Sequence, residues 1–227
     1  MSSAGAIGQI LPLAVGVAVS PMPIAACVLL LATPRARVIG PAFLLGWIAG
    51  IAIVGTIVML VAAPSDANDA GGPATWVSWL KLGLGVLLLL VAVRQWRSQP
   101  KGDAPAEPPK WMGALEKLTP VKALAAAFVL GGVNPKNLLI IIAAGVAVAQ
   151  TGISSGDQAI AWTVFTIIAA VGVAAPVVIF FALGDRAKAI LDGLKVWLIR
   201  HNTAVLAVLF LIIGFKLIGD AITGFAA

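Results

Sequence analysis

The stretch Val-Ser-Pro-Met-Pro at residues 19–23 interrupts one apolar run of membrane length, and Val-Asn-Pro-Lys-Asn at residues 133–137 interrupts another. A broken helix in lipid frees backbone groups that must find partners, so breaks persist where they are buried in protein or line a polar cavity. Two breaks at corresponding places in two halves of a chain are typical of a transporter's substrate site. The two stretches therefore predict both the fold class and the position of the functional site.

The composition is that of an integral membrane protein. Of the 227 residues, 61% are hydrophobic and 11% are charged, far from the balance of a soluble domain. Six apolar stretches are each long enough to cross about 30 Å of hydrocarbon. They cover residues 7–32, 41–63, 76–94, 121–149, 159–183 and 203–224. The sequence predicts an all-α polytopic membrane protein with six transmembrane helices. Because Met1 to Ile7 carries no Lys or Arg, the first stretch is not expected to be a cleaved signal peptide.

The net charge of +6 follows the loops and does not form one basic patch, so no nucleic-acid partner is expected. Most Lys and Arg residues fall in or beside the loops after the first, third and fifth stretches. The loops after the second and fourth stretches carry Asp as their only charged residue. By the positive-inside rule the odd-numbered loops are cytoplasmic, which places both termini on the outer face.

The chain divides into two halves at residues 98–109, which are rich in Pro and charge and are predicted to be a cytoplasmic linker. Residues 1–97 form the first transmembrane repeat, and residues 110–227 form the second, with three helices each. An odd number of helices per half makes the second half enter the membrane from the opposite side, which predicts inverted repeats. Within the second repeat, residues 186–200 place apolar side chains on one side and charged ones on the other, which predicts an amphipathic helix on the cytoplasmic surface.

The two breaks carry the residue types of a helix start. Ser and Asn are preferred N-caps, and Pro is favoured at the first helical position. We expect a half-helix to begin at each break and the two N-termini to converge from opposite leaflets, where N–H groups and Lys136 would favour an anion. The plainer alternative is that the prolines only kink the helices and that Lys136 is neutral or reaches water. The predicted substrate-binding residues are Ser20, Pro21, Pro23, Asn134, Pro135, Lys136 and Asn137.

Five other charged residues are candidates for gating or for charge pairs. Lys216 and Asp220 are four residues apart in the last helix and are expected to pair near the outer surface. Asp185, at the cytoplasmic end of the fifth helix, is expected to pair with Arg35 or Arg37, or to be a proton site.

The sequence offers no catalytic constellation, no nucleotide-binding glycine loop and no His or Cys cluster for a metal. The protein is therefore not expected to be an enzyme or to carry a cofactor. Cys27 is the only cysteine, so no intrachain disulfide forms.

The Pro-x-Pro motif at Pro21-Met22-Pro23 and the Asn-Pro-Lys motif at residues 134–136, on six spans in two halves, resemble the lysine-exporter (LysE) superfamily. The Pro-rich central linker, the Ser-Pro-x-Pro-Ile start and the Asn-Pro-Lys-Asn run look most like its glycopeptidolipid- and sulfolipid-addressing (GAP/Sap) family. The resemblance implies export across the bacterial cytoplasmic membrane, with envelope lipids or glycolipids as the cargo. The apolar Met22 at the first break, where amino-acid exporters often carry a polar residue, favours an amphiphile with an anionic head.

Three functions remain open from the sequence. The first is an exporter that moves an anionic lipid by alternating access, and the second is an exporter of amino acids or other small metabolites. The third is a non-transporting membrane scaffold for a lipid-synthesis or export complex. Beyond membrane lipids and the substrate, the candidate partners are that machinery and a second copy of the chain, because small residues permit close helix packing.

Overall fold

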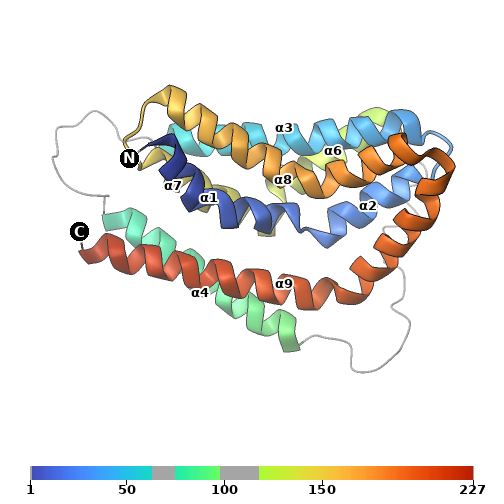
Figure 1. The fold of residues 1–227 in the computed structure, drawn as a ribbon. Coiled ribbons are helices and arrows are strands. Elements are labelled where there is room, and N and C mark those ends of the chain that lie inside the picture. Colours follow the sequence, from blue (N-terminus) through green and yellow to red (C-terminus); the bar gives the residue numbers. More distant parts are fainter. Residues whose placement is uncertain (1, 63–74, 98–117, 227) are drawn as a thin grey trace.

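The computed structural model describes residues 2–62, 75–97 and 118–226, and helices dominate the described chain (Figure 1). Two sets of elements are joined end to end at the predicted breaks: α1 (Ser3–Ala18) with α2 (Pro21–Leu31), and α6 (Pro120–Phe128) through the π-helical turn η1 (Val129–Val133) to α7 (Pro135–Ala149). The other helices are α3 (Ala36–Ala62), α4 (Thr75–Arg97), α8 (Ser155–Leu183) and α9 (Ala187–Ala226), with a short 3-10 turn, η2 (Gly184–Arg186), before α9.

Four helical segments are long and apolar enough to cross a membrane alone, namely Ala36–Ala62, Ser78–Arg97, Ser155–Leu183 and Thr203–Phe225. The number rises to six if each bent pair counts as one span. The bend is 50° between α1 and α2, and 57° between Pro120–Val133 and α7. The predicted all-helical membrane fold is confirmed, with four to six candidate spans.

Proline sets the position of each bend. A proline disfavours helical backbone at the residue before it, and Ser20 (φ −109°, ψ 97°) and Asn134 (φ −54°, ψ 127°) are accordingly non-helical. Pro21 and Pro135 then occupy the first helical position, where a missing N–H has no cost. The same local rule ends α1 and η1 and starts α2 and α7.

The helices form two groups (Figure 1). α1, α2, α3, α6, α7 and α8 pack together, while α4 and α9 lie side by side along one side of that group. α4 packs mainly on α9, and α9 contacts the larger group mainly through α2. The first turn of α1 and the last turn of α9 lie at the same end of the bundle (Figure 1).

Glycine permits the closest contacts within the larger group. Gly46 of α3 lies against the backbone carbonyl of Leu124 in α6, and Gly172 of α8 lies against that of Ala18 in α1. A Cβ at either glycine would collide with the facing carbonyl oxygen. α3 and α6 therefore approach each other closely, and so do α8 and α1, which is how small residues act between membrane helices.

Two tryptophans join α3 and α8 in opposite directions. Trp47 Nε1 of α3 donates to the carbonyl oxygen of Ala169 in α8 at 3.2 Å. Trp162 Nε1 of α8 donates to that of Ala52 in α3 at 3.3 Å. Both indoles are buried, and a buried indole N–H needs such a partner. Each half of the chain thus offers one tryptophan to a carbonyl of the other half.

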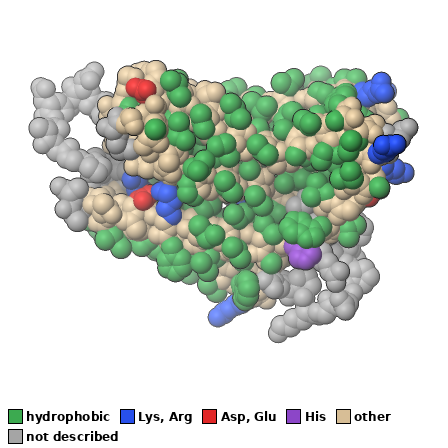
Figure 2. All heavy atoms as spheres, in the orientation of Figure 1, with side chains coloured by type: hydrophobic (Ala, Val, Ile, Leu, Met, Phe, Trp, Pro, Cys, Tyr) green, Lys and Arg blue, Asp and Glu red, His purple; other side chains and the backbone are tan. Residues whose placement is uncertain are grey.

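Large apolar side chains cover the sides of the molecule, while the charged side chains in view lie mostly toward its two ends (Figure 2). Examples of exposed apolar residues are Leu60 and Val61 on α3, Ile167 and Val178 on α8, and Ile222 on α9. Soluble monomers rarely expose contiguous apolar surface on this scale. The sides of the bundle therefore suit contact with lipid.

The amphipathic segment expected at residues 186–200 is the beginning of α9 and runs without a break into the last span. Ala187 and Leu191 of this segment are buried, while Ile190 and Trp197 are exposed. The predicted linker, residues 98–109, lies outside the described residues.

Candidate functional site: the junction of the two broken helices

The two breaks meet inside the bundle. Ser20 of the first break and Asn137 of the second are both buried polar residues, with exposed fractions of 2% and 1%. Ser20 Oγ lies 3.3 Å from Asn137 Oδ1, and Asn137 Nδ2 donates to the carbonyl oxygen of Leu130 at 2.9 Å. Because buried polar groups need hydrogen bonds, the breaks form one connected polar junction, which we call the break junction: Gly16, Val19, Ser20, Leu130, Asn134, Lys136 and Asn137.

Lys136 spans the junction from the second break to the first. Its ammonium nitrogen donates to Gly16 O at 2.9 Å, to Ser20 Oγ at 2.7 Å and to Val19 O at 3.5 Å. The two carbonyls belong to the C-terminal end of α1, where carbonyl groups lack helical partners and the helix dipole is negative. Lys136 therefore acts as a C-terminal cap for a helix that lies in the other half of the chain.

The three donors of the Lys136 ammonium thus all have oxygen partners, but its charge does not have a carboxylate partner among the described residues. An ammonium and an anion attract each other far more strongly than an ammonium and a carbonyl. The contact to Val19 O is also the longest of the three. An anionic group that reached this ammonium could replace Val19 O with a gain in electrostatic energy.

The second break is capped as the sequence predicts. Asn134 Oδ1 accepts a hydrogen bond from the backbone N–H of Lys136 at 3.1 Å, and the backbone N–H of Asn134 donates to Val129 O at 2.8 Å across the π turn. The side chain of Asn134 thus bonds an N–H after the break, and its backbone N–H bonds a carbonyl before the break.

The first break does not follow the prediction for a side-chain cap. Ser20 lies at the N-cap position of α2 without a side-chain cap hydrogen bond, and its hydroxyl donates back to Val17 O at 2.6 Å. An N-cap side chain bonds the N–H of the second or third helical residue, and the third is Pro23, which has no N–H. The second proline of Pro-Met-Pro therefore leaves Met22 as the single N–H donor in the first turn of α2. Fewer N–H groups therefore converge at the junction than we expect from a helix start of this kind.

The remaining candidates take no part in the hydrogen bonds of the junction described above. Pro21 and Pro23 are buried beside it, while Pro135 is exposed. Arg35 and Arg37 are exposed where α2 leads into α3. Asp185 lies in η2, and its side chain is outside the described residues, so its predicted pairing stays a prediction.

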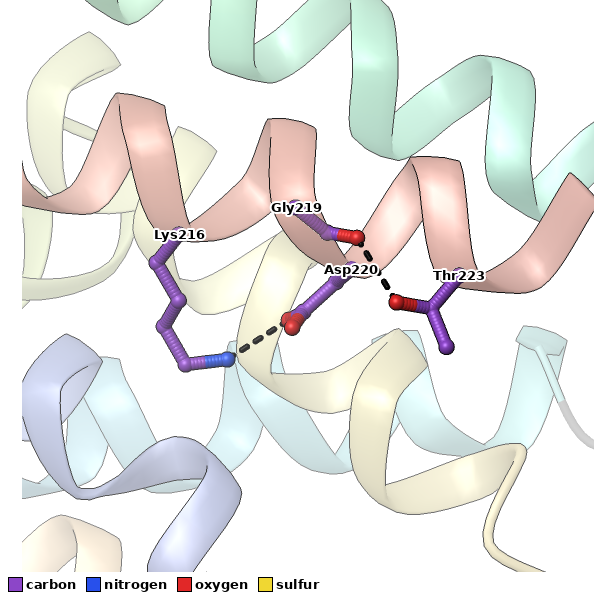
Figure 3. Close-up of polar contacts among 4 residues, drawn as sticks. All are labelled: Lys216, Gly219, Asp220 and Thr223. Atoms are coloured by element: carbon purple, nitrogen blue, oxygen red, sulfur yellow. Dashed lines mark hydrogen bonds and ion pairs between the residues drawn. The ribbon is translucent and has the colours of Figure 1, made fainter.

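The predicted charge pair in the last helix is present. Lys216 Nζ and Asp220 Oδ2 are 2.6 Å apart, and both side chains extend from α9 away from α4 and toward the larger group of helices (Figure 3). Lys81 of α4, which the sequence analysis passed over, interacts electrostatically with both of them. The signal for Lys81 was an ionisable residue within the third apolar stretch.

Within the described part of the chain, no three His, Cys, Asp or Glu residues are grouped so as to hold a metal ion. Membrane-length helices, two of them broken and joined by a polar junction with one uncompensated cation, define a polytopic membrane protein with an internal polar site.

The comparisons with known proteins identify the family. The profile of the family described as Sap, sulfolipid-1-addressing protein, matches residues 10–223. The match covers both breaks and nearly the whole chain, and the protein belongs to this family. Neither a curated protein nor a solved structure matches the chain. The family assignment confirms the resemblance to GAP/Sap proteins and indicates a membrane protein with a lipid-related role in export.

Proposed function

We propose that this protein is an exporter of the bacterial cytoplasmic membrane that moves an anionic amphiphile, an envelope lipid or glycolipid, past the break junction by alternating access. The observation that carries the proposal is the Lys136 ammonium. It lies between the two halves and is partly buried, and its hydrogen-bond partners there are two carbonyls and one hydroxyl. An ionisable residue at this depth is costly and marks a functional site by default.

Binding and movement are coupled through the same atoms. An anionic group that takes Lys136 removes a cap from the carbonyl end of α1, because the contacts to Gly16 and Val19 come from the same ammonium. The end of α1 and the start of α7 are then less tightly joined. We infer that substrate binding releases one half of the bundle from the other, as alternating access requires.

The paired contacts support inverted repeats as the basis of that motion. α3 packs on α6, and α8 packs on α1. Likewise, Trp47 of α3 donates to a carbonyl of α8, and Trp162 of α8 donates to a carbonyl of α3. Exchanging the two halves maps each contact onto its counterpart. Both termini would then lie on the outer face, as the distribution of Lys and Arg favours.

Transport in proteoliposomes tests the proposal. The intact protein and Lys136→Met are reconstituted with a fluorescent anionic lipid, a fluorescent zwitterionic lipid and, separately, radiolabelled amino acids. Met keeps the chain length without the charge. We expect movement of the anionic lipid between leaflets with the intact protein and none above background with Lys136→Met, while Lys122→Met, on the exposed side of α6, retains it.

The other two functions give different outcomes. Transport of amino acids without lipid movement would identify a small-metabolite exporter. Absence of all transport, together with loss of cellular function on deletion of residues 98–109, would identify a scaffold. Undiminished lipid movement by Lys136→Met would contradict the site assignment.

A further inference from the structure

We propose that Lys81, Lys216 and Asp220, which we call the outer triad, form a second binding site for an anionic group, one to two helical turns from the break junction toward the end where α1 begins. The inference rests on the proposed function only for the idea that the same group passes the junction. The binding site itself rests on the position and charge of these three residues.

The position follows from one contact of α9 and from the end of the bundle toward which α9 runs. Ile213 Cδ1 of α9 lies directly over Gly16 of the break junction. With a rise of about 1.5 Å per residue, Lys216 is about 5 Å and Asp220 about 10 Å farther along α9. The end of α9 lies at the same end of the bundle as the start of α1 (Figure 1). The Lys216–Asp220 pair is therefore adjacent to the junction on that side.

Lys81 lies level with this pair. α4 and α9 run antiparallel, and Ser78 approaches Gly224 while Gly85 approaches Gly214. Lys81 falls between the two close contacts on α4, and Asp220 falls between them on α9. The electrostatic interaction of Lys81 with Asp220 and with Lys216 agrees with that placement. Residues from two helices thus lie at one level of the bundle.

The charge balance of the outer triad favours an anion. Two ammonium groups share one carboxylate, and Asp220 is bonded to Lys216, so the three residues carry one net positive charge. The side chains of Lys216 and Asp220 are exposed by 21% and 37%, respectively, and they point toward the larger group of helices (Figure 3). A sulfate, phosphate or carboxylate group that binds both lysines would compete with Asp220 for Lys216.

Because Asp220 competes with the bound anion, substitutions in the outer triad should change anion binding in opposite directions, which a purely structural role does not predict. Removing a lysine should weaken anion binding, whereas Asp220→Asn should strengthen it, because the internal competitor is lost while a polar side chain remains. A pair that only stabilises α9 predicts that each of these substitutions is neutral or harmful to binding.

Trp79 provides a local reporter. It is two residues before Lys81, it is 63% exposed, and it packs edge-on against Phe225 with ring centroids 5.1 Å apart. Bromine on the upper acyl chain quenches nearby tryptophan fluorescence. The part of the quenching that is lost in Trp79→Phe reports a lipid beside α4, and subtracting it separates Trp79 from the other tryptophans.

The full chain in mixed micelles is titrated with brominated phosphatidylglycerol and, separately, with brominated phosphatidylcholine. We expect the anionic lipid to quench Trp79 at the lower mole fraction. Lys81→Ala should weaken that preference by roughly tenfold, the loss of one charge-assisted hydrogen bond. Asp220→Asn should increase it. Lys188 is exposed in the first turn of α9, at the opposite end of the bundle. Lys188→Ala is the matched control and should leave the preference for the anionic lipid unchanged.

Competition with inorganic sulfate distinguishes a site for a lipid from a site for a free anion. If sulfate displaces the brominated lipid at low concentration, the site takes the anionic group itself; if it does not, the site takes the lipid. Both results support the outer triad. Lys216→Arg keeps the charge and should keep the preference, whereas Lys216→Gln removes the charge and should weaken it. Equal quenching by the two lipids, or an unchanged preference in both Lys81→Ala and Lys216→Gln, would overturn the outer triad.

The two proposals fail separately. Loss of lipid movement in Lys136→Met with no charge preference at Trp79 would retain the exporter and reject the outer triad. A charge preference at Trp79 with normal lipid movement in Lys136→Met would retain the outer triad and reject the role of Lys136 in export.

Discussion

The two breaks have similar sequences but use them differently. At the second break, Asn134 caps α7 and Asn137 satisfies the Leu130 carbonyl, so the break serves its own backbone. At the first break Ser20 does not cap α2, and the carbonyls of Gly16 and Val19 depend on Lys136 from the other half. The second break satisfies its own backbone groups, whereas the first depends on Lys136. The first break is therefore where a substrate that binds Lys136 can change the structure.

Lys136→Met should have the largest effect and should damage the first break. It removes the partner of Gly16 O and of Ser20 Oγ. An unsatisfied buried acceptor costs about 1–3 kcal/mol, partly offset because a charge no longer has to be desolvated. We expect the free energy of unfolding to fall by about 2 kcal/mol, measured by denaturation in mixed micelles. Stability equal to that of Lys122→Met would show that α1 does not need the lysine.

Asn137→Leu should damage the second break by a somewhat smaller amount. The side chain keeps its size but leaves the Leu130 carbonyl without its 2.9 Å donor, at a cost of about 1–2 kcal/mol. Because Lys136 still caps α1, the anionic-lipid movement that remains should keep its dependence on Lys136. If Asn137→Leu and Lys136→Met instead had the same transport defect, the two breaks would act as one unit.

A pair of double-mutant cycles compares the breaks directly. Ser20 and Lys136 are hydrogen-bonded through their side chains, so Ser20→Ala and Lys136→Met should be non-additive by about 1 kcal/mol. Asn134 contacts only the backbone of Lys136, so Asn134→Ala should cost about 1 kcal/mol as a lost N-cap and add to Lys136→Met. Additivity in both cycles would contradict the difference between the breaks.

Pro23→Ala should have the smallest effect and should make the first break resemble the second. It restores an N–H at the third position of α2, where Ser20 can cap it. The new hydrogen bond is offset by the lost rigidity of proline in the unfolded chain, so we expect a change in stability below about 0.5 kcal/mol. Amide hydrogen exchange at residue 23 would show the new bond as protection, and free exchange would show that Ser20 stays with Val17.

The sequence predicts the parts of this molecule that depend on local chemistry. The apolar stretches match the helices because length and hydropathy define a span, and each bend falls at its predicted proline because the residue before proline leaves the helical region. The cap at Asn134 follows from the same local rules.

Other features depend on distant residues and were not predictable in this way. The sequence places Lys136 at a break but does not show that it faces the carbonyl end of α1. The missing cap at Ser20 was available in principle, because Pro23 lacks the N–H that a cap would bond. The relevance of Lys81 depends on the packing of α4 beside α9, which the sequence does not show.

The π turn at Val129–Val133 has a consequence for how this family changes over evolution. A π turn holds one residue more than an α-helical turn, which is how a single-residue insertion is accommodated in a helix. The backbone N–H of Asn134 reaches Val129 O, five residues back, and Asn137 already serves the neighbouring carbonyl of Leu130. A homologue that lacks one residue between Phe128 and Asn134 could close this turn as an ordinary α-helix and keep its Asn-Pro-Lys motif in place. We therefore expect insertions and deletions of one residue to concentrate here, and sequences that have lost one to need no asparagine at the position of Asn137.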